Sequence, residues 1–391
     1  MLGAELYGEI GVVQNSIAMF QILASFSVGL ACSKYVAELK EVAPEDAGGV
    51  VGFSLIFSIL SGTIIGILFF LLSPFLAANI LGRPEIVGPL KISSLLLVLG
   101  AWNGVQVGTL SGFEAFRSQA ISNFFSGMVT FFCMIVGAYI WKTQGVIFGM
   151  IVGLFSQCCI NSYMVRGYFI KYKIKIYLQR IKSQFCLLYE FSLPAMLGGL
   201  IHWISIWLGN VMLVNRVDGY VQMGVYNASY QWFSIVLFFP SILTNTILPI
   251  MAERRGVKDL ASTKKVLLSS VKYSFMAALP VGIILTLFSK YIMKFYGHGF
   301  DAEWAVFVVI IIAALFACAQ NMIGNTFVVV GKMWIHFKLN MLWCFLYLVN
   351  VCFLLGQGFG AMALALAGCI AYIIRFLFVM IFSFAVLRTV K

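Results

Sequence analysis

The sequence is poor in charge. Charged residues make up 10% of its 391 residues, while hydrophobic residues make up 62%. Soluble domains carry roughly 25% charged and about 45–50% apolar residues, so this composition excludes a soluble globular domain. The chain has only 8 Pro but 36 Gly, and small residues allow membrane helices to pack closely. We therefore expect an all-α integral membrane protein.

The central parts of the long apolar runs also contain no carboxylate. All 14 Asp and Glu fall in predicted loops or at the ends of apolar runs. An exporter of cationic compounds that couples to protons or sodium is expected to need a carboxylate within a span.

The 9 Cys include no CxxC pair, which is typical of reduced packing residues. No Gly-rich motif ending in Lys-Ser or Lys-Thr occurs, which argues against ATP hydrolysis by this chain. We predict no metal and no cofactor.

What the chain has in abundance is long apolar runs. A helix needs about 20 mostly apolar residues to cross the hydrocarbon core, and the backbone in lipid must satisfy its own hydrogen bonds. Strand-like alternation, which a transmembrane barrel requires, is missing from these runs. We predict eleven spans, at about 10–31, 49–77, 92–111, 120–140, 145–165, 191–214, 225–251, 266–288, 304–330, 334–356 and 361–387.

The positive residues indicate the orientation. Of 26 Lys and Arg, 18 fall in one set of alternate loops and adjoining span ends and 6 in the other set, with Lys272 and Arg375 inside spans. Cytoplasmic loops are enriched in Lys and Arg, so the C-terminus is predicted to be cytoplasmic and Met1 to lie outside. The net charge of +12 then reflects orientation and contact with anionic lipid. We expect no nucleic-acid partner.

The chain resembles itself at an offset of about 216 residues. Gly3 and Gly8 recur as Gly219 and Gly224, and such repeats are typical of transporters built from two duplicated lobes. The second copy has a full run, 191–214, before Gly219, whereas the first copy begins almost at Gly3. We therefore expect twelve spans, six in each lobe, of which eleven are visible. A truncated chain or a misassigned start would explain the missing helix.

The repeat and the charge pattern divide the chain into three parts. Residues 1–166 form a predicted N-terminal lobe of five spans, and 191–391 form a C-terminal lobe of six. Between them, 167–190 is a basic linker on the predicted cytoplasmic side. The linker is expected to contact the anionic membrane surface.

Polar residues within the spans are the candidate site. In the seventh run Asn227, Gln231 and Asn245 share one helical face with two serines. At the repeat offset of 216 residues, Asn15 is the position equivalent to Gln231. In the sixth run His202 shares a face with small residues. Two interpretations stay open: close helix packing, or a wet cleft in which amide and hydroxyl groups contact sugar hydroxyls.

Cations complete the set. Arg375 lies near the middle of the last span, where it either contacts a substrate phosphate or pairs with carbonyl and amide groups inside its lobe. Lys34 and Arg216 end spans on opposite sides, as orientation charges or as partners of a pyrophosphate. The complete set of predicted substrate-binding residues is Asn15, Lys34, His202, Arg216, Asn227, Gln231, Asn245 and Arg375.

Four short motifs carry a family resemblance. They are GAELYG at 3–8, LSGFEAFR at 110–117, FSLPA at 191–195 and GVYNA at 224–228. In order and spacing they resemble the polysaccharide-export flippases of the multidrug/oligosaccharidyl-lipid/polysaccharide exporter superfamily, and in particular the O-antigen and capsule repeat-unit type.

The resemblance implies two six-helix lobes of MATE type in a bacterial or archaeal cytoplasmic membrane. It also implies alternating access and a cargo of polyprenyl-pyrophosphate-linked oligosaccharide. The family's first, second, seventh and eighth helices line the cavity. Here these correspond to the missing helix and to the runs 10–31, 191–214 and 225–251.

The predicted function is that of a flippase, not of an enzyme. It would move the lipid-linked oligosaccharide from the cytoplasmic to the outer leaflet, with membrane lipids and the polysaccharide polymerase machinery as further partners. A multidrug exporter of the same fold is the first alternative. A membrane glycan polymerase or glycosyltransferase is the second, although the longest loop holds one carboxylate, Glu190, and the chain has no Asp-x-Asp motif.

Overall fold

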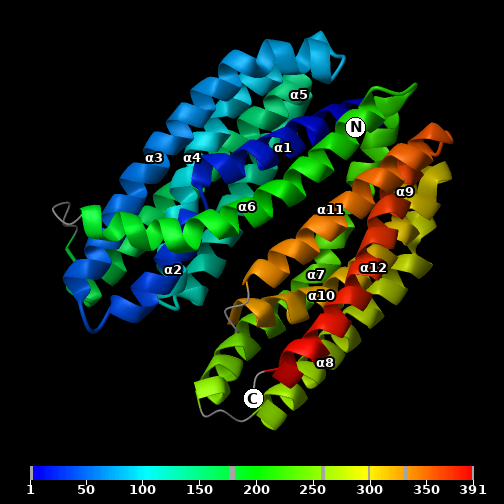
Figure 1. The fold of residues 1–391 in the computed structure, drawn as a ribbon. Coiled ribbons are helices and arrows are strands. Elements are labelled where there is room, and N and C mark those ends of the chain that lie inside the picture. Colours follow the sequence, from blue (N-terminus) through cyan, green and yellow to red (C-terminus); the bar gives the residue numbers. More distant parts are fainter. Residues whose placement is uncertain (1–2, 176–180, 257–259, 298–299, 330–332, 390–391) are drawn as a thin grey trace. The chain divides into compact units, whose positions relative to one another are not determined.

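The structure is a computed structural model that describes residues 3–175, 181–256, 260–297, 300–329 and 333–389. Every regular element in these ranges is helical (Figure 1). The α-helices are α1 (Gly3–Ser25), α2 (Val28–Leu39), α3 (Pro44–Phe75), α4 (Val87–Gly112), α5 (Phe116–Lys171), α6 (Ile181–Val214), α7 (Gly219–Gly256), α8 (Leu260–Leu287), α9 (Ser289–Tyr296), α10 (Trp304–Val329), α11 (Met333–Gly356) and α12 (Gly360–Thr389). Short π- or 3₁₀-helical turns occupy Leu76–Ile80, Pro84–Ile86 and Asp301–Glu303.

The helices follow the predicted apolar runs closely. Six described helices are long and apolar enough to cross a membrane, or eight when each of two bent pairs is taken as one span. Helix α5 contains two predicted runs and is interrupted between them, because Trp141 and Lys142 leave the helical region (Lys142 φ 49°, ψ −128°). The expected total of eleven visible spans among twelve stays a prediction.

The first predicted run, 10–31, is wrong as a single helix. Helix α1 ends at Ser25 and α2 begins at Val28, with a bend of 48° between them. Phe26 and Ser27 adopt left-handed conformations (φ 48° and 52°), which are unfavourable for residues with a Cβ. The Ser61 hydroxyl of α3 donates a hydrogen bond of 2.6 Å to the Ala24 carbonyl. This bond satisfies a backbone group freed by the break, as membrane helices require.

The chain divides into two compact units. Unit 1 comprises 1–11 and 208–391, and unit 2 comprises 12–207. Helices α1 and α6 therefore each contribute residues to both units. The lobe boundaries predicted from the repeat, 1–166 and 191–391, stay a prediction.

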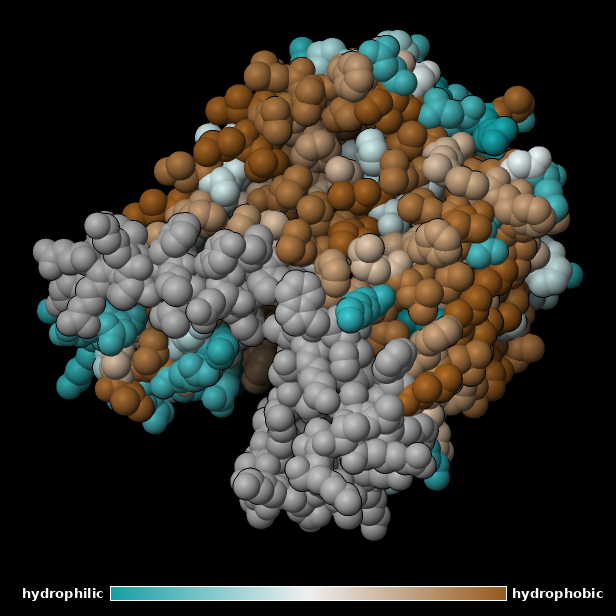
Figure 2. All heavy atoms as spheres, in the orientation of Figure 1, coloured by the Kyte–Doolittle hydropathy of each residue, from teal (hydrophilic) through white to brown (hydrophobic). Residues whose placement is uncertain are grey.

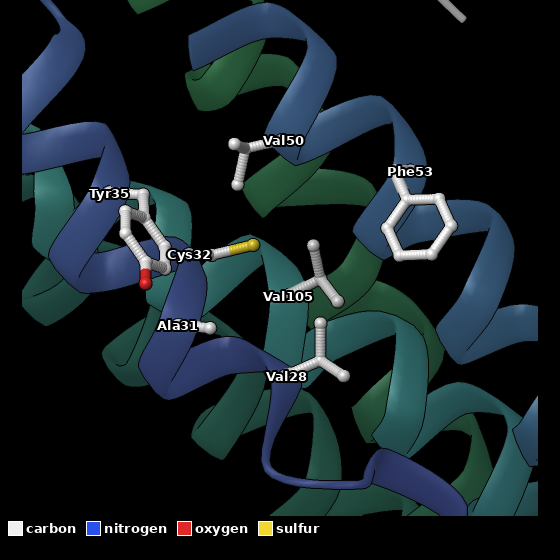
Figure 3. Close-up of a cluster of buried hydrophobic side chains, with 7 residues drawn as sticks. All are labelled: Val28, Ala31, Cys32, Tyr35, Val50, Phe53 and Val105. Carbon is white, nitrogen blue, oxygen red and sulfur yellow. The ribbon is translucent and has the colours of Figure 1, made fainter. Parts of the chain in front are cut away.

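One core cluster of unit 2 combines small, β-branched and aromatic side chains. Figure 3 shows the Cys32 sulfur of α2 directed toward Val50 of α3 and Val105 of α4, with Val28 below Val105. The Cys32 residue is fully buried, and none of the described cysteines forms a disulfide. This burial agrees with the interpretation of the cysteines as packing residues.

Figure 2 shows hydrophobic residues over most of the described surface on one face of the molecule, with hydrophilic residues gathered at its periphery. Exposed large apolar side chains are frequent on α3 and α5, among them Leu71, Phe124 and Phe131. A soluble monomer does not expose apolar area on this scale. The surface is that of a protein surrounded by lipid.

The motif at 110–117 forms the turn from α4 to α5. Glu114 is left-handed here (φ 58°), and Phe113 stacks on Tyr168 and Tyr172, with ring centroids 5.4 and 5.3 Å away. Lys40 donates hydrogen bonds to the Glu114 carboxylate at 2.9 Å and to the Gly112 carbonyl at 3.3 Å. The hydrogen bond and charge of Lys40 lower the pKa of Glu114 below its ordinary value.

This ion pair gives a pH-dependent contribution to stability. Because the pKa of Glu114 is lower in the folded protein, the contribution is present above the ordinary value of 4.5 and is lost as the pH falls through the lowered pKa. We expect Glu114→Gln to lower the melting temperature at pH 7 by only about 1 °C, since solvent screens this exposed carboxylate. Thermal unfolding in detergent at pH 7 and pH 3 measures the difference, which should disappear at the lower pH. A difference that grows on acidification would contradict the assignment.

Candidate functional site

The first turns of α1 cross the first turns of α7 at glycines, within unit 1. A Cβ added at Gly8 would meet the Tyr220 carbonyl, and a Cβ added at Gly224 would meet the Ala4 carbonyl. Tyr220 and Gly224 lie 216 positions after Ala4 and Gly8. The contact of Gly8 with α7 is therefore equivalent to the contact of Gly224 with α1. A pseudo-twofold axis relates contacts in this way. The two backbones approach closely because neither glycine carries a side chain.

Amide side chains follow directly after this crossing. The side chain of Asn227 lies against Gly11, its equivalent at the same offset. One turn further along α7, Gln231 is exposed and hydrogen bonded to Tyr7 of α1. Two predicted residues, Asn227 and Gln231, are thus brought together at the crossing. Tyr7, which the sequence analysis did not single out, belongs to the same polar group.

An aromatic cluster borders Tyr7 and Gln231. The Tyr7 ring lies edge-on to Tyr296 and Phe300, with centroids 6.0 and 6.2 Å away. The Trp232 indole donates a hydrogen bond of 3.1 Å to the Tyr296 hydroxyl. Helix α9, which supplies Tyr296, follows a 64° bend after α8. Amide and phenol groups beside aromatic rings are suited to sugars, which present hydroxyls at their edges and C–H groups on their faces.

Helix α6 carries the predicted stripe of His202 and small residues. His202 is half-buried, and its ring lies edge-on to Trp203, with centroids 6.2 Å apart. In unit 2 the Trp207 indole donates a hydrogen bond of 3.0 Å to the Ser16 hydroxyl. In unit 1 Gly209 lies directly under the Tyr347 ring. Gly209 therefore serves close helix packing, one of the two interpretations given for this face.

The other predicted residues lie in different surroundings. Asn15 is half-buried in α1, Lys34 is exposed on α2 beside the Tyr35 ring, and Arg216 is exposed in the turn between α6 and α7. Arg375 is 6% exposed within unit 1. The side chain of Asn245 lies outside the described residues.

One carboxylate corrects the sequence analysis. Glu9 was placed at a span end, but it is the seventh residue of α1 and only 6% exposed. Hydropathy puts the start of the span after Glu9, whereas the helix itself begins at Gly3.

An amide network between α4 and α5 was missed as well. Asn103 donates to the Gln157 side chain at 3.3 Å and accepts a hydrogen bond from Asn161 at 2.9 Å, while Gln157 donates to Asn123 at 2.7 Å. The sequence shows amide residues in each of these two apolar helices. It does not show that the amides of α4 contact those of α5, which only the packing of the helices reveals.

Comparison with known proteins shows the family of the chain. The family model described as "Polysaccharide biosynthesis protein" matches residues 2–309. The EPS I polysaccharide export inner membrane protein EpsE of Ralstonia nicotianae is 24% identical over 202 residues, and that of Ralstonia solanacearum is 24% identical over 192. The alignments cover 50% and 48% of this chain and 45% and 43% of those proteins, so the matched part spans under half of each relative's length.

Solved transporters share the fold. An inward-facing multidrug resistance MATE family transporter of the MOP superfamily superposes with a TM-score of 0.80 at 16% identity, covering 99% of this chain and 92% of that one. A MOP superfamily transporter from Pyrococcus furiosus, described as having a binding pocket of reversed polarity, gives 0.77 at 15% identity, covering 100% and 90%.

The fold is therefore the all-α fold of multi-pass membrane transporters of the MATE type. The chain belongs to the polysaccharide biosynthesis protein family. Membership in this family and the resemblance to polysaccharide exporters of the MOP superfamily agree with the interpretation of the short motifs.

Proposed function

We propose that the protein is a flippase for a polyprenyl-pyrophosphate-linked oligosaccharide. Its sugars and pyrophosphate pass from the cytoplasmic to the outer leaflet by alternating access, while the lipid tail stays in the bilayer. The observation that carries this proposal is the exposed amide of Gln231, which lies one turn beyond Asn227 on α7 and beside an aromatic cluster. Exposed polar groups at membrane depth are costly and mark transport pathways.

The roles of the residues follow from their chemistry. Gln231, Asn227, Asn15 and His202 offer donors and acceptors to sugar hydroxyls. Lys34 and Arg216 are exposed cations and suit the pyrophosphate, which forms strong charge-assisted hydrogen bonds. We propose that Lys34 receives the headgroup on the cytoplasmic side and that Arg216 lies on the outer side. This arrangement follows the orientation predicted from the positive residues, with a cytoplasmic C-terminus.

The double variant Gln231→Ala with His202→Ala tests the assignment. Each lost hydrogen bond costs about 0.5–1.5 kcal/mol, so we expect surface polysaccharide to fall about tenfold in a strain that lacks its own flippase. Gln357→Ala is the matched control, because Gln357 is exposed in the turn before α12. Undiminished polysaccharide from the double variant, at equal protein in the membrane, would reject these positions.

A second candidate is an exporter of organic cations, which the buried carboxylate of Glu9 favours. The deletion strain separates the two functions. If it keeps its surface polysaccharide and becomes sensitive to cationic drugs, and Glu9→Gln fails to restore resistance, the exporter is correct and the flippase is not.

A further inference from the structure

Arg375 is a buried cation in the interior of unit 1. It is the sixteenth residue of α12 and is 6% exposed. An arginine does not deprotonate in proteins, and an unpaired charge in an apolar interior is far too costly to tolerate. Something must therefore compensate the guanidinium.

The described part of the chain places no carboxylate beside this guanidinium. The Nε atom of Arg375 is buried and has no hydrogen-bond partner there. The electrostatic neighbours of Arg375 among the described residues are Tyr372, one turn earlier on α12, and Cys344 on α11. A buried arginine normally pairs with a carboxylate, with backbone carbonyls or with a ligand. Because no carboxylate is among these neighbours and Nε lacks a partner among the described residues, a ligand fits this guanidinium best.

The guanidinium of Arg375 only donates hydrogen bonds, and the groups around it can donate as well. Tyr372 is buried against the Trp343 ring at 5.2 Å and Phe233 of α7 at 5.8 Å, and Tyr347 lies close by. A guanidinium, phenol hydroxyls and a thiol all present hydrogens. Such a lining is complementary to an anion and excludes a cation.

We propose that a small inorganic anion of the size of chloride binds Arg375 between α11 and α12. The guanidinium provides the charge, and the Tyr372 hydroxyl donates a hydrogen bond to the same ion. The site lies within unit 1. Because α11 and α12 are packed against each other, the bound anion links them and neutralises the buried charge. A lipid-linked pyrophosphate is too large for a residue with this little exposure.

The test uses the purified full-length protein in detergent. Thermal unfolding is followed at constant sodium and ionic strength in chloride, bromide or gluconate. A ligand that binds only the folded state raises the melting temperature by mass action. We expect a saturable rise of about 2–4 °C in chloride and bromide relative to gluconate, and saturable binding of radioactive chloride at about one ion per chain.

Two variants and one control locate the site. Arg375→Gln should abolish both the thermal shift and chloride binding, and Tyr372→Phe should weaken binding several-fold while keeping the ring packed. Arg117→Gln makes the same change at an exposed position and should leave both intact. If Arg375→Gln does not fold, Tyr372→Phe and binding to the wild type decide.

Three results would overturn the proposal. In the first, the wild type melts at the same temperature in chloride and gluconate and binds no radioactive chloride. In the second, Arg375→Gln folds and retains the chloride response. In the third, inorganic pyrophosphate stabilises the wild type through Arg375 and chloride does not, which would assign the residue to the substrate site. The flippase proposal is tested by surface polysaccharide and stands or falls separately.

Discussion

Gly8→Leu and Gly224→Leu are each expected to reduce transport at least tenfold, and to similar extents. A Cβ at either glycine would meet a carbonyl of the opposite helix, Tyr220 or Ala4. No rotamer avoids such a contact, because the position of Cβ does not depend on the rotamer. The carbonyl that it meets belongs to the backbone and cannot rotate away as a side chain would. Overpacking of this kind costs about 1–3 kcal/mol or more, and the two helices must separate to accommodate it.

Surface polysaccharide in a strain without its own flippase measures the effect. Size-exclusion chromatography of the tagged protein shows whether the variant still folds. Gly127→Leu is the matched control, because nothing lies within 4 Å of a Cβ added there. The pseudo-twofold arrangement makes a specific demand: a strong defect in one variant with full activity in the other would contradict it.

The second large effect is expected from Asn103→Leu in unit 2. The substitution removes hydrogen bonds to Gln157 and Asn161 at once, and Asn161 is almost completely buried at 1% exposure. A buried amide without a partner costs about 1–3 kcal/mol. We therefore expect the melting temperature in detergent to fall by about 3–6 °C.

Asn350→Leu provides the comparison for this variant. Asn350 lies in the apolar helix α11 and, among the described residues, donates only to the Leu346 carbonyl of its own helix. Its replacement should be neutral or slightly stabilising. Equal losses of stability in the two variants would mean that the network between α4 and α5 contributes nothing beyond the individual side chains.

Two residues of the candidate site could be inferred from spacing along one helix. Asn227 and Gln231 share a face because they stand four residues apart, and the structure places both at the α1–α7 crossing. Tyr7 could not be inferred, since a tyrosine near the start of an apolar run has many ordinary roles. Glu9 was misplaced because hydropathy locates the apolar part of a helix and not the residue at which the helix begins.

The sequence by itself indicated an integral membrane protein, a helical fold, and a repeat of the two halves at an offset of 216 residues. These properties follow from composition and periodicity, which lipid enforces on every segment separately. Tertiary structure decided the break at Phe26 and Ser27, the meeting of Asn103 with Asn161, and the burial of Arg375 away from the described carboxylates. Each of these depends on which helix lies alongside, and no pattern within one helix encodes its neighbour.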